Sequence, residues 1–418
     1  MGLVLHILFL SDNFFPEVNA PASRTHDHAK EWIKAGHNVT VITCVPNFPK
    51  GQVFDGYRNK IWQEEIIDGI RVVRVWSYIA ANEGFSKRIL DFLSYMLTSF
   101  LASFFVRKVD IVVGTSPQFF TAVSAWLVAF YKRKPFIFEV RDLWPESIRA
   151  VGAMHESKLL VLLEKLELFL YRRAHGIVVV THSFKDNLVK RGIDGKKISV
   201  VTNGVDVTKF KPQEKDFELI SRYSFENKFI VGYIGTLGLA HSLETILFAA
   251  KKISQRRLED KIHFLFLGDG ANKIKLEKLA LELELKNVTF LASVPKAEVV
   301  SYWSIIDISI ISLKNTELFK SVIPSKMFES MSMGIPILHA VSGESAKIID
   351  YTGAGIPVEP ENSSAIADEI IRLSQDNAAL AVLGRKGQIA SESFDRTRLA
   401  NEMLKVLAAC CTSKESGM

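Results

Sequence analysis

Residues 229–254 read FIVGYIGTLGLAHSLETILFAAKKIS, and this stretch decides how the rest of the chain is interpreted. An apolar run, Phe229–Tyr233, enters a glycine-rich turn, and Leu243–Ser254 then shows apolar residues at helical spacing. A buried strand that leads through glycines into a helix is the first half of a strand–helix–strand unit. The stretch therefore predicts a parallel sheet with helices on its faces.

The same alternation runs through almost the whole chain, in two series. The first series has the strand candidates Leu3–Leu10, Val39–Thr43, Ile70–Trp76, Ile111–Gly114, Phe136–Val140, Ile177–Thr181 and Ile198–Val201. The second has Phe229–Tyr233, Ile262–Leu267, Val288–Leu291, Asp307–Ile311 and Ile335–Leu338. Helical stretches such as Ser23–Ala35, Gln118–Tyr131, Ser157–Arg173, Lys273–Leu285 and Ser325–Met331 separate the strands. We therefore predict an α/β protein with two doubly wound, Rossmann-like parallel sheets.

The length of 418 residues also fits two domains. The alternation lapses into turn and charged residues around Asn203–Phe225, which we interpret as the linker. The predicted domains are residues 1–208 and 209–393. Residues 394–418 would then hold a last helix, Thr397–Ala409, which either closes the second domain or crosses back to the first.

Composition excludes several classes of protein. With 48% hydrophobic and 23% charged residues, the chain has enough apolar side chains for real cores and does not resemble a disordered protein. Its three cysteines, Cys44, Cys410 and Cys411, are too few and too unevenly placed for a disulfide framework or a closed cysteine zinc site. The start, MGLVLHILFLSD, lacks the basic region and cleavage site of a secretory signal. We expect a cytoplasmic protein.

The positive charge is confined to the first half of the chain. Residues 1–210 hold 27 Lys/Arg against 20 Asp/Glu, a net charge of +7, whereas residues 211–418 hold 25 against 26, a net charge of −1. Within the basic half, Phe92–Val106 has no charge and is bounded by Lys87/Arg88 and Arg107/Lys108. Fifteen residues are too few to span a bilayer, which takes about 20.

Two interpretations of Phe92–Val106 remain open. It is either a buried core helix or a helix in a membrane interface, with its basic ends near anionic headgroups. Nucleic acid is a poorer partner for the basic half, because the sequence has no interleaved aromatic and basic residues of the single-strand-binding kind and no helix-turn-helix signature.

Three motifs in the second half could hold a phosphorylated ligand. Glycines at Gly235–Gly238 let backbone amides approach a ligand, and His241 could donate a hydrogen bond to a phosphate. A tight turn and a solvated surface histidine are the alternatives. Gly268-Asp269-Gly270 frees the backbone at the end of the next strand, where a nucleoside could bind, although this pattern is commonly only a turn.

The third motif is Pro324-Ser325-Lys326-Met-Phe-Glu329. Pro324 suits an early helix position, and the Ser325 hydroxyl can cap backbone amides. A lysine in the first turn opposes the helix dipole, so an anion bound at Lys326 would explain its presence. A surface pair between Lys326 and Glu329 is the alternative.

The first half has its own candidate site at Glu139-Val-Arg141-Asp142-Leu-Trp144-Pro145-Glu146, after the strand Phe136–Val140. Charged residues at a strand's carboxyl end form a cleft wall, or else a structural ion-pair loop. The loop Asp12–Arg24, which contains Asn19, reaches the same edge. The sequence has no Asp-x-Asp, no phosphate-binding GxxxxGK[ST] and no HExxH. A diphosphate would therefore be stabilised by Lys, Arg and backbone amides, without metal.

In this order the motifs resemble those of the family 4 retaining glycosyltransferases of GT-B fold, in the bacterial O-antigen and capsule branch. The matching stretches are Gly36-His-Asn-Val-Thr-Val-Ile42 with Pro46-Asn-Phe-Pro49, Arg141–Glu146, Asn203-Gly-Val-Asp206 and Pro324–Glu329. The resemblance covers nearly the whole chain. It implies two facing domains, with sugar transfer from a nucleotide diphosphate at retained anomeric configuration.

The resemblance also assigns roles to residues. Lys326 would neutralise the donor diphosphate and Glu329 would hold the ribose. The further donor residues are Gly235, Thr236, His241, Gly268, Asp269, Gly270 and Ser325. Asn19, Arg24, Arg141 and Asp142 would bind the acceptor, a saccharide linked to polyprenyl diphosphate. Arg141 would also join Lys326 and Glu329 in catalysis.

The branch suggests a UDP-linked donor carrying an N-acetylated hexose or a 6-deoxyhexosamine such as N-acetyl-L-fucosamine. The enzyme would need no cofactor or metal and would lie on the inner face of the cell membrane, bound to an anionic surface. Two departures from the family pattern are Ser321, where a second Glu is usual, and Arg141, where a His is common. A sugar-nucleotide epimerase of the same fold and a non-catalytic membrane-bound assembly subunit are the alternatives.

Overall fold

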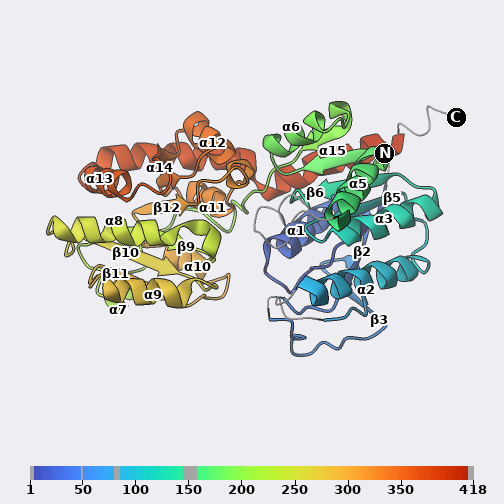
Figure 1. The fold of residues 1–418 in the computed structure, drawn as a ribbon, viewed down its shortest axis with the longest axis horizontal. Coiled ribbons are helices and arrows are strands. Elements are labelled where there is room, and N and C mark those ends of the chain that lie inside the picture. The colour runs from blue at the N-terminus through green and yellow to red at the C-terminus, as the bar shows by residue number, and fades with distance from the viewer. Residues whose placement is uncertain (1–3, 49, 80–84, 145–157, 413–418) are drawn as a thin grey trace. The chain divides into compact units, whose positions relative to one another are not determined.

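The computed structural model describes residues 4–48, 50–79, 85–144 and 158–412, which belong to two compact units (Figure 1). Unit 1 comprises Met1–Thr202 and Arg396–Met418, and unit 2 comprises Asn203–Asp395. The predicted pair of α/β domains is confirmed. The division follows Thr202, however, and not residue 208.

Unit 1 is built on an eight-stranded sheet with the order β3-β4-β2-β1-β5-β6-β7-β8. Its strands are β1 His6–Leu10, β2 Asn38–Cys44, β3 Trp62–Ile67, β4 Ile70–Val75, β5 Ile111–Thr115, β6 Phe136–Val140, β7 Gly176–Val179 and β8 Ile198–Val200. All neighbours are parallel except β3 and β4, which form an antiparallel edge. The apolar strands required by a sheet buried on both faces are thus where the sequence predicted them, and β3 is additional.

Helices cover both faces of this sheet. They are α1 Ala20–Lys34, α2 Phe85–Ser103, α3 Phe119–Lys132, α5 Lys158–Arg173, α6 His182–Lys190 and α15 Arg396–Thr412. Side chains of α2, α3, α5 and α6 share one hydrophobic core with the sheet, and those of α1 and α15 share the other.

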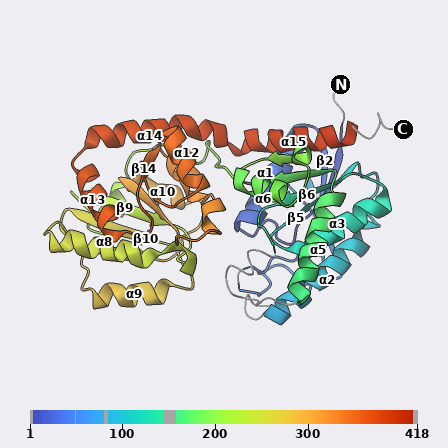
Figure 2. The ribbon, with the colours of Figure 1, turned by 45° about the horizontal axis from the view of Figure 1, so that its top comes forward.

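The last helix crosses back to the first unit, which answers the question that the sequence left open (Figure 2). Leu399, Met403 and Leu407 of α15 are buried beside α1. The Trp32 indole donates to the carbonyl of Ala400 at 2.8 Å.

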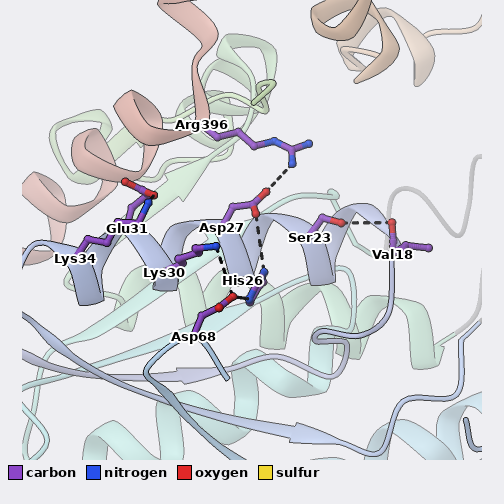
Figure 3. Close-up of polar contacts among 9 residues, drawn as sticks. All are labelled: Val18, Ser23, His26, Asp27, Lys30, Glu31, Lys34, Asp68 and Arg396. Carbon is purple, nitrogen blue, oxygen red and sulfur yellow. Dashed lines mark hydrogen bonds and ion pairs between the residues drawn. The ribbon is translucent and has the colours of Figure 1, made fainter. Parts of the chain in front are cut away.

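Polar contacts also hold α1 to the start of α15 and to the turn between β3 and β4 (Figure 3). Asp27 pairs with Arg396 at the start of α15, with 2.5 Å between Oδ2 and Nη1. His26 and Lys30 lie 3.0 and 3.6 Å from the carboxylate of Asp68, in the turn between β3 and β4. The helix is therefore held to α15 and to the hairpin, and its first residues carry the loop of the candidate acceptor site.

Unit 2 has a six-stranded, fully parallel sheet with the order β11-β10-β9-β12-β13-β14. The strands are β9 Phe229–Ile234, β10 Ile262–Leu267, β11 Val288–Leu291, β12 Ile308–Ser312, β13 Ile337–Ala340 and β14 Gly355–Pro357. The helices are α7 Phe217–Arg222, α8 Leu243–Gln255, α9 Lys273–Glu282, α10 Val299–Ser304, α11 Lys326–Ser332, α12 Glu344–Thr352, α13 Ser363–Ser374 and α14 Asn377–Ser391. One core contains side chains of α8, α9 and α13, and the other contains side chains of α7, α10, α11 and α12.

The predicted linker Asn203–Phe225 is wrong as a linker. Val205, Phe210, Leu219 and Phe225 are buried in a core of unit 2. The Asp216 side chain caps α7 by accepting from the amide of Leu219 at 3.1 Å. The turn and charged residues of this segment are therefore helix caps and exposed positions between buried anchors.

Candidate functional site

The two glycine turns of unit 2 pack backbone against backbone at the carboxyl ends of β9 and β10. The amide of Leu237 donates to the carbonyl of Asp269 at 2.9 Å. A Cβ on Gly268 would lie 2.0 Å from the Gly235 carbonyl oxygen, and one on Gly270 would lie 2.4 Å from that of Leu237. Gly235 and Gly268 also have φ values of 134° and 152°, which disfavour other residues. Close packing of the turns thus accounts for these glycines, and their position at the strand ends keeps them as ligand candidates.

Lys326 lies against the first of these turns. Its Nζ is buried and has no hydrogen-bond partner among the described residues. The nitrogen is 3.4 Å from the centroid of the Tyr233 ring, and a Cβ on Gly235 would approach it to 3.1 Å. Burial lowers the pKa of Lys326 to about 7, against a smaller raising influence from Glu329. The surface ion pair that the sequence left open is therefore wrong, because the amine lies inside the turn.

His241 belongs to the same group of residues. Its ring meets the Tyr233 ring edge-on at a centroid distance of 5.9 Å. Burial, and secondly the charge of Lys326, lower the pKa of His241 to about 3. The side chain is consequently a neutral imidazole at neutral pH, and the alternative of a solvated surface histidine is wrong.

The remaining predicted donor residues lie around these turns and differ in their exposure and contacts. Thr236 is exposed, and its carbonyl accepts from the Tyr233 hydroxyl at 2.8 Å. Asp269 is exposed and contacts Lys273 at 3.4 Å. The expected cap by Ser325 is wrong, since its side chain makes no cap bond. The reason is its helical backbone, with φ −60° and ψ −31°, whereas a capping residue is normally extended.

Arg141 is a buried cation of unit 1, directly after β6. Its own amide and that of Asp142 donate to the Ser116 hydroxyl at 2.7 and 3.2 Å. Its Nε and Nη1 atoms are buried without a hydrogen-bond partner among the described residues. Burial lowers the pKa of Arg141 to about 10, which leaves the group charged at neutral pH, and the Glu139 carboxylate opposes the shift. An anion is the natural partner for these unused donors.

Arg24 is used inside the fold. Its Nε contacts Glu139 at 2.8 Å, and its two Nη atoms donate to the carbonyls of Thr202 and Val201 at 2.6 and 2.9 Å. Arg24 therefore has a structural role in unit 1, and its predicted role in acceptor binding stays a prediction. Asn19 is likewise engaged through Oδ1, which caps α1 by accepting from the amide of Ala22 at 2.9 Å.

Helix α2, which contains most of the uncharged stretch Phe92–Val106, has one packed face and one exposed apolar face. Tyr95, Ser99 and Ala102 of α2 are buried, whereas residues spaced along the opposite face are exposed. These exposed residues are Leu90, Leu93, Leu97 and Leu101, with Phe104 and Phe105 directly after the helix. The core interpretation of Phe92–Val106 is thus confirmed for the buried face, whereas the membrane-interface interpretation stays a prediction for the exposed face. The helix ends at Ser103, earlier than predicted. No helix in the described part of the chain is long and apolar enough to cross a membrane.

Comparison with known proteins identifies the chain. The model of Glycosyltransferase Family 4 matches residues 22–209, and that of Glycosyl transferases group 1 matches residues 215–389. The chain is 23% identical to WcaI of Escherichia coli K12, assigned to colanic acid biosynthesis as a glycosyl transferase, over 94% of this chain and 96% of that protein. It is 22% identical to the capsular polysaccharide biosynthesis glycosyltransferase CapM of Staphylococcus aureus, over 89% and 96%.

Solved structures agree on the fold. The Anabaena protein HepE, crystallised with UDP, superposes with a TM-score of 0.71 at 16% identity, over 97% of this chain and 100% of HepE. The chain is a family 4 glycosyltransferase. Its two parallel-sheet domains have the GT-B fold.

The sequence analysis of this family 4 glycosyltransferase did not predict two residues that contact the candidate site residues. Glu139, which we quoted only as part of a motif, is the buried carboxylate beside Arg24 and Arg141. Tyr233 contacts Lys326, His241 and Thr236 but looks like a core residue in a strand. Within the described ranges, no three His, Cys, Asp or Glu side chains come together in a way that could hold a metal ion.

Proposed function

We propose that this family 4 glycosyltransferase moves a sugar from a nucleotide diphosphate, with retention of configuration, to a polyprenyl-diphosphate-linked saccharide in bacterial surface polysaccharide assembly. The observation that carries the proposal is Lys326, a buried amine with no hydrogen-bond partner in the described structure, beside a glycine turn. Burying such a group is costly unless a ligand supplies the missing partner. A diphosphate supplies both acceptor oxygens and negative charge.

On this proposal, unit 2 stabilises the departing diphosphate. Lys326 neutralises the charge that develops when the bond to the sugar breaks, which is the kind of interaction that lowers a reaction barrier. Neutral His241 donates one hydrogen bond, and amides of the turn that contains Gly235 donate others. Glu329 would hold the ribose, as the family resemblance implies. HepE was crystallised with UDP, so UDP is the first nucleotide to test.

Unit 1 would bind the acceptor through Arg141. Its buried, unused guanidinium donors suit an acceptor phosphate or a charged sugar group. Asp142 is exposed next to it and is available for hydroxyl groups of the acceptor. Names of the related proteins, colanic acid and capsular polysaccharide biosynthesis, support a polysaccharide acceptor.

The exposed face of α2 supports a peripheral place on the membrane, where a lipid-linked acceptor is found. The apolar surface continues onto the end of α3, because Phe104 meets Tyr131 at a centroid distance of 4.7 Å, and both Phe130 and Tyr131 are exposed. Exposed Lys87, Arg88, Arg107 and Lys108 lie at the two ends of the helical segment. Apolar burial together with basic residues is how interfacial helices bind anionic lipid.

The direct test is transfer from radiolabelled UDP-, GDP- and dTDP-sugars, with and without a polyprenyl-diphosphate saccharide. Labelled lipid whose new linkage keeps the donor's anomeric configuration supports the proposal. Interconversion of the donor without acceptor indicates an epimerase. Silence with every donor and acceptor indicates the non-catalytic assembly subunit.

The membrane contact has a separate test with a matched control. The variant Leu97→Ser/Leu101→Ser removes two exposed leucines of α2, and Ile274→Ser/Leu281→Ser removes two exposed residues of α9. We expect only the α2 variant to lose binding to anionic vesicles, with circular dichroism melts unchanged for both. Undiminished sedimentation of the α2 variant with vesicles would remove α2 as the membrane contact.

A further inference from the structure

A tyrosine outside the predicted site connects its parts. We propose that Tyr233 is the positioning residue for Lys326: its ring face holds the lysine nitrogen over the glycine turn until a donor diphosphate arrives, and its hydroxyl fixes that turn. The inference rests on the proposed donor site and adds the device that arranges it.

The ring contact is the first part of the argument. Tyr233 is only 1% exposed, so its ring is fixed by the core. Lys326 Nζ lies 3.4 Å from the ring centroid, well within the roughly 6 Å at which a cation is attracted to an aromatic face. Because this nitrogen has no hydrogen-bond partner among the described residues, the ring is the contact that defines its place beside the glycine turn.

The hydroxyl contact is the second part. The Tyr233 hydroxyl donates to the Thr236 carbonyl at 2.8 Å, inside the turn that Lys326 touches. One side chain therefore sets both the backbone that would face the diphosphate and the amine that would neutralise it. Placing donors before the reaction begins is what makes electrostatic stabilisation effective.

The surroundings of Lys326 determine how it responds to pH. The charged or titratable groups that influence it are Glu329 and His241, together with Tyr233 itself. Burial gives His241 a pKa of about 3 and raises that of Tyr233 far above neutrality, so neither titrates near pH 7. Lys326, with a pKa of about 7, does change charge there. A bound diphosphate favours its charged form, so donor binding above pH 7 takes up a proton.

The test uses the full chain and measures the affinity of UDP and of GDP between about pH 6.5 and 8.5 in wild type, Tyr233→Leu and Tyr233→Phe. Tyr233→Leu removes the ring that attracts the ammonium but also opens the amine to water. Burial is the largest influence on the pKa of Lys326, so we expect this pKa to rise and binding to weaken only at higher pH than in wild type. Turnover at saturating donor should also fall by about tenfold, the order of a desolvated cation–π contact. Tyr233→Phe keeps the ring and should keep the wild-type midpoint. Phe266→Leu, which removes a ring 6.0 Å from Tyr233, controls for loss of core packing.

The outcomes separate the inference from the proposed function. An unchanged pH midpoint in Tyr233→Leu, with wild-type binding intact, would overturn the positioning role and leave the donor site standing. The same midpoint shift in Phe266→Leu would also overturn it, because general loosening would then explain the effect. If wild type binds neither nucleotide at any pH, the proposed donor site itself fails. A Tyr233→Leu chain that does not fold is replaced by Tyr233→Met, with the same expectation.

Discussion

Among the described residues, each unit buries one cation with unused hydrogen-bond donors, and the surroundings of the two cations differ. Arg141 in unit 1 lies near Glu139 and Arg24, and with a pKa of about 10 it stays charged at neutral pH. Lys326 in unit 2 faces an aromatic ring, and burial lowers its pKa to about 7. A guanidinium tolerates burial with its charge, whereas an ammonium gives up its proton more readily. The charge of Arg141 is therefore fixed at neutral pH, whereas the charge of Lys326 is one that an anionic ligand such as the proposed donor would switch on.

The largest expected effect concerns the carboxylate that balances unit 1. Glu139→Ala leaves Arg24 and Arg141 buried without their shared counter-charge, which typically costs about 3–5 kcal/mol. We expect the free energy of unfolding to fall by that amount in chemical denaturation followed by circular dichroism. The control is Glu64→Ala, which removes an exposed partner of Arg71 and should cost less than about 1 kcal/mol. Equal losses in the two variants would show that Arg141 needs no fixed partner.

The same carboxylate also makes the stability of unit 1 depend on pH. The pKa of Glu139 in the folded protein is lowered, although burial acts in the opposite direction, because Arg24 and Arg141 favour its charged form. Its stabilising contribution is therefore present at neutral pH and is lost as the pH falls through the acid range, below the usual pKa of a glutamate. Glu139→Gln should unfold with a weaker acid dependence than wild type.

The second prediction concerns the switchable cation. On the proposed function, Lys326→Ala would remove the charge that stabilises the departing diphosphate, and such a loss typically lowers kcat by about 100-fold or more. Lys320→Ala, at an exposed lysine that pairs with Glu317, is the matched control and should retain wild-type turnover. Half of the wild-type kcat remaining in Lys326→Ala at saturating donor would sink its catalytic role.

The sequence could locate these two cations but could not predict that their pKa values differ. The reason is that the residues around Lys326 are far apart along the chain. The motifs placed Arg141 after a strand and Lys326 at a helix start, and both positions are confirmed. The ring beneath Lys326 comes from β9, a strand far from it in sequence, and a tyrosine in a buried run resembles ordinary core. Only the folded chain brings Lys326, Tyr233 and His241 together, so their altered pKa values could not be anticipated.

The sequence predicted those parts of the fold in which buried segments consist mostly of apolar residues. Parallel strands such as Ile111–Thr115 and Ile262–Leu267 are buried throughout and mostly apolar, and the sequence predicted them. Strand β3 was missed because it lies at an edge, and its sequence WQEEII is neither a continuous apolar run nor a regular alternation of polar and apolar residues. The segment Asn203–Phe225 was mistaken for a linker because its few buried side chains are separated by charged positions.

A third prediction turns the lysine of unit 2 into the kind of cation that unit 1 has. In wild type, UDP affinity should fall by about tenfold per pH unit above pH 7, because the free protein then holds a neutral amine that must be protonated. Lys326→Arg stays charged across this range, so its UDP affinity should not change between about pH 7 and 8.5. Isothermal titration calorimetry gives both affinity and proton uptake. Equal pH dependence in the two proteins would show that another group titrates.

The last prediction is that removing metal ions has no effect on sugar transfer. It tests whether the protein's own cations are enough to neutralise the donor diphosphate. If Lys326 neutralises the donor diphosphate, with no Asp-x-Asp to hold a bridging metal, sugar transfer should continue at its full rate in excess EDTA. The measurement needs enzyme stripped of metal beforehand and a parallel assay with added Mg²⁺ or Mn²⁺. Loss of transfer in EDTA that either metal restores would mean that carboxylates outside any Asp-x-Asp pattern bind a metal. The metal would then neutralise most of the diphosphate charge, and Lys326 would only add to it. The contrast between the fixed charge of Arg141 and the switchable charge of Lys326 would no longer explain how the diphosphate leaves.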